Sequence, residues 1–150
     1  VDGLDFSQAT NLTTIDDHAF EKWSLVGDHC NWDLSNIKLE EIGEKAFDNA
    51  MAPNGGNNKV YLIKFPKTIK SIGWEAFGQD SSTDPKTAYI EFTTTDITTI
   101  NNIQFGSDWQ PHKDKYSDCY VYVPTEDLIA VYNGVTNFNP KDFAIKALEK

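Results

Sequence analysis

The sequence predicts an α/β fold, a solenoid in which short parallel strands alternate with short helical turns. Three observations lead to this prediction. A short motif recurs four times at nearly constant spacing, and a pair of alternating apolar residues precedes each copy. The chain of 150 residues is also 39% hydrophobic and 13% aromatic. A chain of this size buries the core of one domain, and its composition is not that of a disordered segment.

The recurring motif consists of isoleucine, three variable residues, alanine and phenylalanine. It occupies residues 15–20, 42–47 and 72–77, with a degraded copy at 100–105. Its phenylalanines are 27, 30 and 28 residues apart, and its isoleucines show the same intervals. One such unit cannot bury its apolar side chains alone, whereas stacked units share a continuous core. We therefore expect four units, at about residues 4–31, 32–59, 60–87 and 88–118.

Each copy of the motif follows a pair of apolar residues two positions apart. The pairs are Leu4/Phe6, Trp32/Leu34, Ile63/Phe65 and Ile90/Phe92, and a fifth pair, Val121/Val123, follows the last copy. Alternation with a period of two indicates a strand with one buried face. Strands of successive units then pair in parallel, about 4.8 Å apart.

The motif itself should form a second short extended piece followed by a helical turn. Phe47 and Phe77 are expected to be buried and stacked one unit apart. Gly43 and Gly73 suit the bend between the two pieces, where we expect a positive φ. Asp16 and Asn101 hold that position in the first and fourth copies, and these residue types also tolerate it.

Residues 119–150 depart from the motif and are expected to form a C-terminal cap. A strand at 120–124 ends in proline, which suits an edge strand. Thr125 can cap a helix from Glu126 to about Tyr132, and a second helix should start at Asn139-Pro140 and run through Leu148. The chain opens at Val1 without methionine and shows no N-terminal cap, so we expect a fragment of a longer protein.

The Ile-Gly-x-x-Ala-Phe signature at 42–47 and 72–77 resembles the BspA-like leucine-rich repeat family. Phe65-Pro66 before the third copy and Val-Tyr-Val-Pro at 121–124 are also similar to that family. The resemblance implies a right-handed leucine-rich-repeat-like solenoid in a bacterial cell-surface or secreted protein. It implies adhesion or binding of host or bacterial macromolecules, and no catalytic motif. A plain parallel β-helix is the competing fold, and short helical turns at each Ala-Phe would favour the leucine-rich repeat.

Charge and motif content exclude several functions. The chain has 13 basic and 23 acidic residues and a net charge of −10, which disfavours nucleic acid and anionic membranes as partners. No apolar run approaches the roughly 18 residues of a membrane span. His18, His29 and His112 belong to no catalytic motif, and the acidic residues show no calcium-loop spacing. We therefore expect no enzyme activity, catalytic residues, metal or cofactor.

Ligand binding is expected on the outward positions of the strands, because solenoid sheets commonly serve as binding surfaces. Exposed aromatic residues beside charges have the composition of a recognition surface, although tyrosine also simply favours strands. Trp109 is a second candidate as an exposed loop side chain, unless it folds back over the nearest unit. The candidate residues are Leu62, Lys64, Tyr89, Glu91, Tyr120, Tyr122 and Trp109.

The function expected from these observations is a non-enzymatic binding or adhesion module. It would recognise a protein or glycan on a host or bacterial surface through the sheet. The alternative is a structural spacer that displays a neighbouring domain and has no ligand of its own. A contiguous exposed aromatic patch on the sheet would favour binding, and a uniformly charged sheet would favour the spacer.

The two cysteines hold equivalent positions in the repeat. Cys30 lies two residues before Trp32, and Cys119 lies two before Val121. The stacking places them three units apart, which is roughly 14 Å between Cα atoms at the spacing of paired strands. A disulfide requires about 4.4–6.8 Å. We therefore expect two free, buried thiols.

Overall fold

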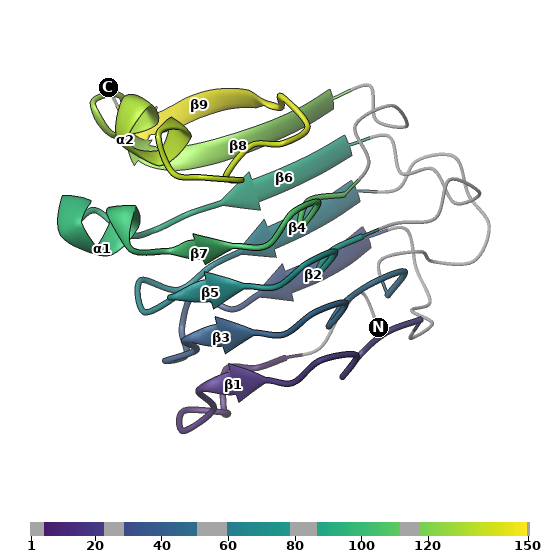
Figure 1. The fold of residues 1–150 in the computed structure, drawn as a ribbon. Coiled ribbons are helices and arrows are strands. Elements are labelled where there is room, and N and C mark those ends of the chain that lie inside the picture. Colours follow the sequence, from purple (N-terminus) through teal and green to yellow (C-terminus); the bar gives the residue numbers. More distant parts are fainter. Residues whose placement is uncertain (1–4, 23–28, 51–59, 79–86, 112–117, 150) are drawn as a thin grey trace.

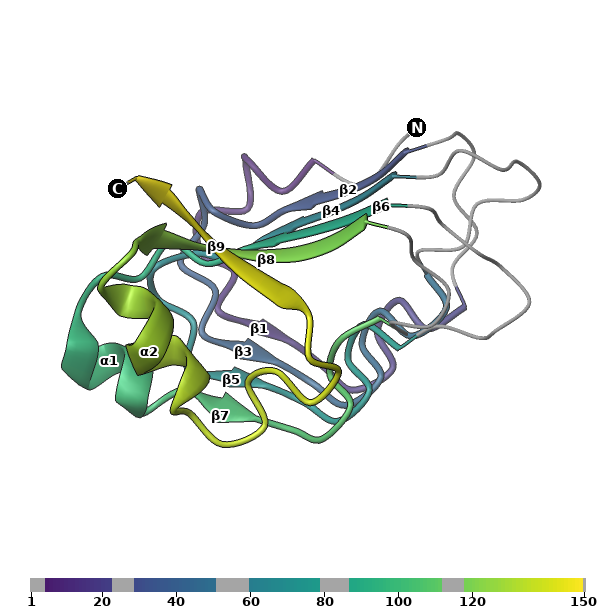
Figure 2. The same ribbon diagram turned by 90° about the horizontal axis from the view of Figure 1, so that it is seen from above.

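The computed structural model describes residues 5–22, 29–50, 60–78, 87–111 and 118–149. The protein is an α/β fold with two parallel sheets and few helices. One sheet has five strands in the order β2-β4-β6-β8-β9, and the other has four in the order β1-β3-β5-β7. Figure 1 shows the strands stacked along the molecule, and Figure 2 shows the two sheets as separate layers.

The strands of the five-stranded sheet are longer than those of the four-stranded sheet. The first consists of β2 (His29–Asp33), β4 (Val60–Lys64), β6 (Thr87–Glu91), β8 (Asp118–Thr125) and β9 (Ala144–Glu149). The second consists of β1 (Thr14–Ile15), β3 (Glu41–Ile42), β5 (Ser71–Ile72) and β7 (Gln104–Phe105). The helices α1 (Ile97–Asn101) and α2 (Leu128–Asn133) lie side by side at one end of the sheets (Figure 2).

Inward-facing residues of the five-stranded sheet lie in register from strand to strand. Trp32 pairs with Ile63, Ile63 with Ile90, and Ile90 with Val121. These four side chains are fully buried, as are Leu34, Phe65, Phe92 and Val123 two positions further on. The alternation therefore identified the buried face of β2, β4, β6 and β8 correctly. Of the first pair, Phe6 is buried and Leu4 lies outside the described residues.

The core between the sheets contains a column of phenylalanine rings. Phe20 stacks on Phe47 with 5.3 Å between ring centroids, and Phe47 stacks on Phe77 at 4.9 Å and an interplanar angle of 6°. Phe47 and Phe77 are fully buried, which confirms the prediction for both. Ile15, Ile42 and Ile72 lie in register beside them in the four-stranded sheet.

The fourth copy of the motif was aligned wrongly. Phe105 pairs with Ile72 in the four-stranded sheet, so it occupies the isoleucine position and not that of Phe77. The Phe77 N–H donates to the Trp109 carbonyl, as the Phe47 N–H donates to that of Ala76, so Trp109 takes the alanine position. The cause is α1, which is capped by the Asp96 side chain and adds residues before the strand.

The glycines have a different role from the one expected. Gly43 and Gly73 do not have a positive φ; Lys45 and Glu75, two residues later, do, at 52° and 50°. A Cβ on Gly73 would lie 2.5 Å from the Glu44 backbone nitrogen, and one on Gly43 would lie 2.4 Å from that of Asp17. Glycine is therefore required because the backbone segments that follow neighbouring strands of the four-stranded sheet approach closely.

The Ala-Phe segments form hydrogen-bonded turns and not the expected helical turns. The Ala46 N–H donates to the Gly43 carbonyl, and the Ala76 N–H donates to that of Gly73. Each turn contains one residue of positive φ, which a continuing α-helix does not accommodate. The short helical turns at Ala-Phe that would favour a leucine-rich repeat are thus not found at residues 43–47 and 73–77.

The C-terminal segment differs from the prediction at two points. Residues 144–149 form a strand and not a helix, because the Asn139 side chain closes a turn onto the backbone of Phe143. This strand pairs with β8, so β8 is not an edge, and its pairing skips Pro124, which lacks an N–H. The helix expected at 126–132 is confirmed as α2, with its N-cap at Asp127 and not at Thr125.

Candidate functional site

The outer face of the five-stranded sheet holds six of the seven candidate binding residues. Leu62, Tyr89 and Tyr120 lie in register in one row, and Lys64, Glu91 and Tyr122 lie in the adjacent row. All six side chains are half-buried. The rows are those expected, because residues two apart on a strand share a face. We call these six residues the tyrosine face.

The three tyrosines of this face form one contiguous cluster. Tyr89 stacks on Tyr122 with 5.6 Å between ring centroids and an interplanar angle of 15°. Tyr120 lies 6.5 Å from Tyr89 and 6.1 Å from Tyr122 by the same measure. The rings hold one another in place because pairs at these separations attract. The cluster is therefore a preformed aromatic surface.

The tyrosine hydroxyls are polar groups without protein partners in the described part of the chain. No hydrogen bond engages the hydroxyl of Tyr89, Tyr120 or Tyr122 there, so each can bond to water or a ligand. Burial raises the pKa of Tyr122, and the nearby Tyr89 hydroxyl adds to this effect. Tyr122 therefore remains a neutral hydrogen-bond donor near neutral pH.

Two lysines, Lys64 and Lys146, lie on the same face as the tyrosines. Lys64 was an expected site residue and Lys146 was not. Lys64 forms an ion pair with Glu91 at 3.6 Å. Lys146, on β9 in register with Tyr122, places its Nζ 3.8 Å from the centroid of the Tyr120 ring. Lys146 was not among the expected site residues because a helix was predicted for this segment. The alternation of Phe143, Ile145 and Ala147 is nevertheless typical of a strand.

Trp109, the seventh candidate, does not belong to this site. It is fully buried and not exposed, and its Nε1–H donates to the carbonyls of Asn137 and Phe138 at 2.9 and 3.0 Å. The indole packs against Phe65, Phe92 and Phe105. The expectation of an exposed loop tryptophan is therefore wrong, and Trp109 connects the core to the C-terminal segment.

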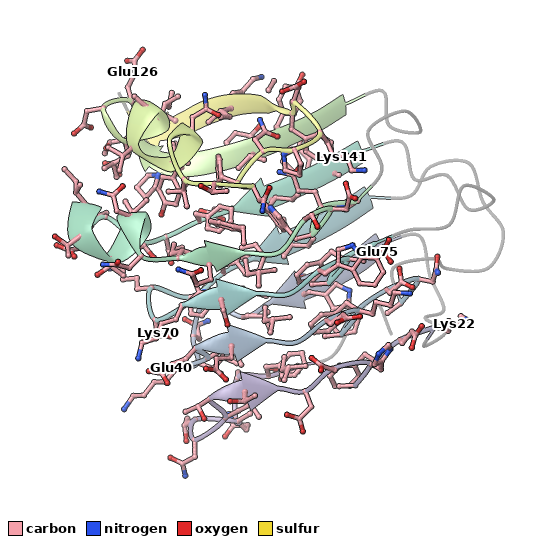
Figure 3. All side chains as sticks on the ribbon, viewed as in Figure 1. Lys22, Glu40, Lys70, Glu75, Glu126 and Lys141 are labelled. Atoms are coloured by element: carbon pink, nitrogen blue, oxygen red, sulfur yellow. The ribbon has the colours of Figure 1, made fainter. Side chains whose placement is uncertain are left out.

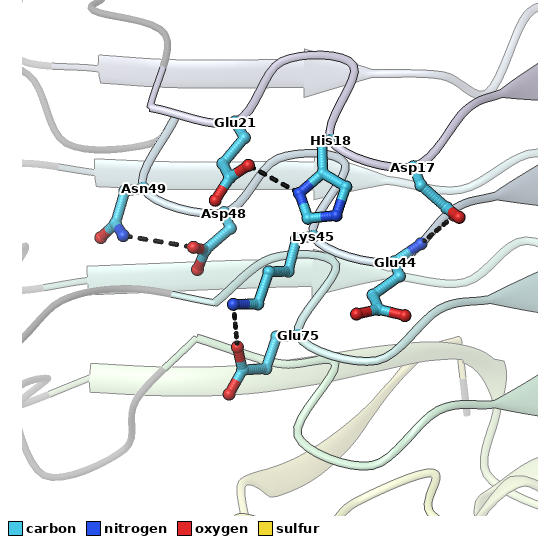
Figure 4. A network of polar contacts seen from close by, with 8 residues as sticks. All are labelled: Asp17, His18, Glu21, Glu44, Lys45, Asp48, Asn49 and Glu75. Carbon is cyan, nitrogen blue, oxygen red and sulfur yellow. Dashed lines mark hydrogen bonds and ion pairs between the residues drawn. The ribbon is translucent and has the colours of Figure 1, made fainter.

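Ion pairs at the turns lie away from the tyrosine face. Glu40–Lys70 and Lys45–Glu75 each join the segments beside β3 and β5, and Figure 3 shows Lys70 to the left of Glu75. Figure 4 shows the Lys45–Glu75 end, where Asp48 accepts from the Asn49 amide. Burial, with a further contribution from Glu75, raises the pKa of Asp48.

The same network contains His18, whose Nδ1 lies 2.6 Å from a carboxylate oxygen of Glu21. Both belong to one exposed turn, and neither serine nor cysteine belongs to the group in Figure 4. Within the described residues no three histidine, cysteine or acidic side chains are grouped to hold a metal ion. His29 and His112 have side chains outside the described part, so the expectation for them stays a prediction.

Comparison with known proteins adds no family assignment. No family model, curated protein or solved structure matches the chain significantly. Across the described residues, no helix has both the length and the apolar character needed to cross a membrane.

Proposed function

We propose that the chain is a non-enzymatic binding module, a right-handed leucine-rich-repeat-like solenoid of four units and a C-terminal cap. Support comes from the recurring motif and from strands of successive units that pair in register. Crossovers between parallel strands of one sheet are almost always right-handed. The resemblance to BspA-like proteins supports a bacterial cell-surface or secreted parent protein.

The turns at Ala-Phe favour the competing parallel β-helix as a description of the backbone path. They are hydrogen-bonded turns with positive φ at Lys45 and Glu75 and not helices. Both descriptions stack the same strands and leave the same outer face. The proposed binding surface therefore does not depend on which description is used.

The tyrosine face is the observation that carries the binding proposal. Half-exposed tyrosines offer a large contact area with few rotatable bonds, together with hydroxyls that can pair with a ligand. The face is aromatic at Tyr89, Tyr120 and Tyr122 and is not uniformly charged, which favours binding over a spacer role. Its ligand is proposed to be a protein or glycan on a host or bacterial surface.

A binding screen with a triple variant tests this function. The intact chain is applied to an array of immobilised glycans and matrix proteins, beside the variant with Tyr89→Ser, Tyr120→Ser and Tyr122→Ser. We expect the wild type to be retained by at least one probe and the variant to bind that probe about tenfold more weakly or worse. Circular dichroism and a thermal melt establish that the variant is folded.

The matched control is Trp74→Ser, which removes an aromatic side chain that is 39% exposed but lies at a turn. It should bind the probe as the wild type does. Retention of the triple variant at wild-type affinity would refute the tyrosine face as the binding surface. Failure of the wild type to bind any probe would favour the spacer.

A further inference from the structure

A hollow lined by basic residues lies beside the tyrosine face. It has a volume of about 310 Å³, and its lining includes Lys38, Lys64 and Lys67 together with Ser35, Thr68 and Thr93. These residues end or follow β2, β4 and β6, so three successive units contribute to it. Lys64 also belongs to the tyrosine face, which makes the two surfaces adjacent.

The lining is basic in a strongly acidic protein. Three of the 13 basic residues line this hollow and no acidic residue does, although the chain carries a net charge of −10. The larger hollow along the four-stranded sheet, of about 740 Å³, has the opposite character, because Asp16, Asp17, Glu41 and Glu44 line it and no lysine does.

The charges of the basic hollow are largely uncompensated. Lys64 lies 3.6 Å from Glu91, whereas no ion pair engages Lys38 or Lys67 among the described residues. Of the carboxylates close in sequence, Asp33 is hydrogen bonded to the N–H and hydroxyl of Ser35 at 3.0 and 2.6 Å, and Glu40 is paired with Lys70 at 2.7 Å. Two ammonium groups therefore remain available to a ligand.

Threonine hydroxyls hold the walls of the hollow together. The Thr68 hydroxyl donates to the Leu39 carbonyl at 2.7 Å, and the Thr93 hydroxyl donates to the Phe65 carbonyl at 2.8 Å. Each bond joins the loop after one strand to the loop after its neighbour. The positions of the lysine backbones are thus fixed before any ligand binds, which lowers the entropic cost of binding.

We propose that this hollow binds an oxyanion, a sulfate, phosphate or carboxylate group, through the ammonium groups of Lys38 and Lys67. Hydrogen bonds between an ammonium and an oxyanion are charge-assisted and stronger than neutral ones. The net charge of the protein repels anions at long range, but this repulsion is screened beyond about 8 Å at physiological salt. The site is distinct from the tyrosine cluster and does not rest on it.

Titration of the intact chain with sodium sulfate, at ionic strength held constant with sodium chloride, tests the proposal. Backbone amide NMR signals of residues 35–38 and 67–68 should shift saturably. The double variant Lys38→Gln/Lys67→Gln should bind sulfate about tenfold more weakly, as expected for the loss of charge-assisted hydrogen bonds. Lys70→Gln is the control, because it removes one positive charge from a lysine outside the hollow, which is paired with Glu40 at 2.7 Å.

A second titration, with a sulfated disaccharide, distinguishes the sources of the oxyanion. Tighter binding than that of inorganic sulfate, lost in the double variant, would assign the group to a sugar. Equal binding would assign the site to the free anion. Absence of saturable shifts with both probes, or an equal loss in Lys70→Gln and the double variant, would overturn the proposal.

Discussion

Two kinds of residue determine how closely neighbouring parallel segments of the chain pack. Phenylalanine rings fill the interior, with Phe77 stacked on Phe47, and glycines allow the backbones to approach. The glycines lie where the chain leaves the short strands, and a side chain there would meet backbone atoms, which cannot move aside. Stacking therefore depends on filling space at one position and leaving it empty at another.

The phenylalanine column predicts a large stability loss on truncation. Phe77→Ala removes a fully buried ring and leaves a cavity, so we expect the free energy of unfolding to fall by about 3–5 kcal/mol. Urea denaturation measures this loss. Trp74→Ala, at an exposed turn, should cost clearly less. A loss below about 1 kcal/mol at Phe77 would contradict its central place in the core.

Replacement of glycine by alanine should have different effects on stability at Gly73 and at Gly134. Gly73→Ala places a Cβ 2.5 Å from the Glu44 nitrogen, and such overpacking costs about 1–3 kcal/mol or more. At Gly134 the nearest atoms are 3.4 Å away and the conformation is helical, so alanine should be neutral or slightly stabilising. Thermal melts of both variants check this, and equal effects would contradict the explanation by close approach.

Among the secondary-structure elements, the long strands β4 and β6 could be predicted from the sequence. The inserted helix α1 and the terminal strand β9 could not. Alternation identified β4 and β6 because a strand buried on one face needs an apolar residue at every second position. The helix α1 shifted the segment that follows it, and the pairing of Phe105 with Ile72 and the hydrogen bond from Phe77 to Trp109 reveal that shift. The strand β9 was missed because Asn139-Pro140 also suits a helix start.

Some residues of the candidate site could likewise be predicted from the sequence and others could not. The rows of the tyrosine face follow from strand periodicity, so Tyr89 and Tyr122 could be placed on one surface in advance. Lys146 depends on β9, and the burial of Trp109 depends on carbonyls of Asn137 and Phe138 that come from the C-terminal segment. Contacts between segments far apart in sequence leave no local pattern to detect.

The hydrogen bond that joins α2 to the segment after β6 predicts that the stability of the protein depends on pH. The buried Tyr132 hydroxyl donates to the Thr94 carbonyl at 2.6 Å, and burial raises the pKa of Tyr132 well above its usual 10.0. The folded state therefore favours the protonated phenol, which stabilises the protein below the unfolded pKa. As the pH rises above about 10, the unfolded state ionises first and this stability is progressively lost.

Tyr132→Phe tests that dependence. The variant should be less stable at neutral pH by about 1 kcal/mol, the usual net value of a hydrogen bond. Its stability should then fall less steeply than that of the wild type between pH 9 and 11 (roughly one unit on either side of the ordinary tyrosine pKa). Parallel profiles in urea denaturation would contradict the assigned role of Tyr132.

At the scale of the whole molecule, the register determines the distance between the cysteines. Cys30, Tyr61, Ala88 and Cys119 are successive partners, so the cysteines lie three strands apart as expected. Their side chains lie outside the described residues, and thiol burial stays a prediction. At about 4.8 Å per strand no disulfide can form between them.

Mass spectrometry of the unreduced protein should therefore detect two free thiols. Ellman's reagent should react slowly with the native protein if the thiols are buried, and with two equivalents after unfolding. A Cys30–Cys119 disulfide would contradict the strand order. Rapid reaction of the native protein would contradict only the predicted burial.

Hydrogen exchange shows whether the outer face of the five-stranded sheet binds a ligand. The intact chain is compared with and without the best-retained probe of the binding array, and amide protection is followed by mass spectrometry. We expect added protection on β6, β8 and β9, around Tyr89, Tyr122 and Lys146, and none on β1, β3 and β5. Protection confined to the four-stranded sheet would contradict it.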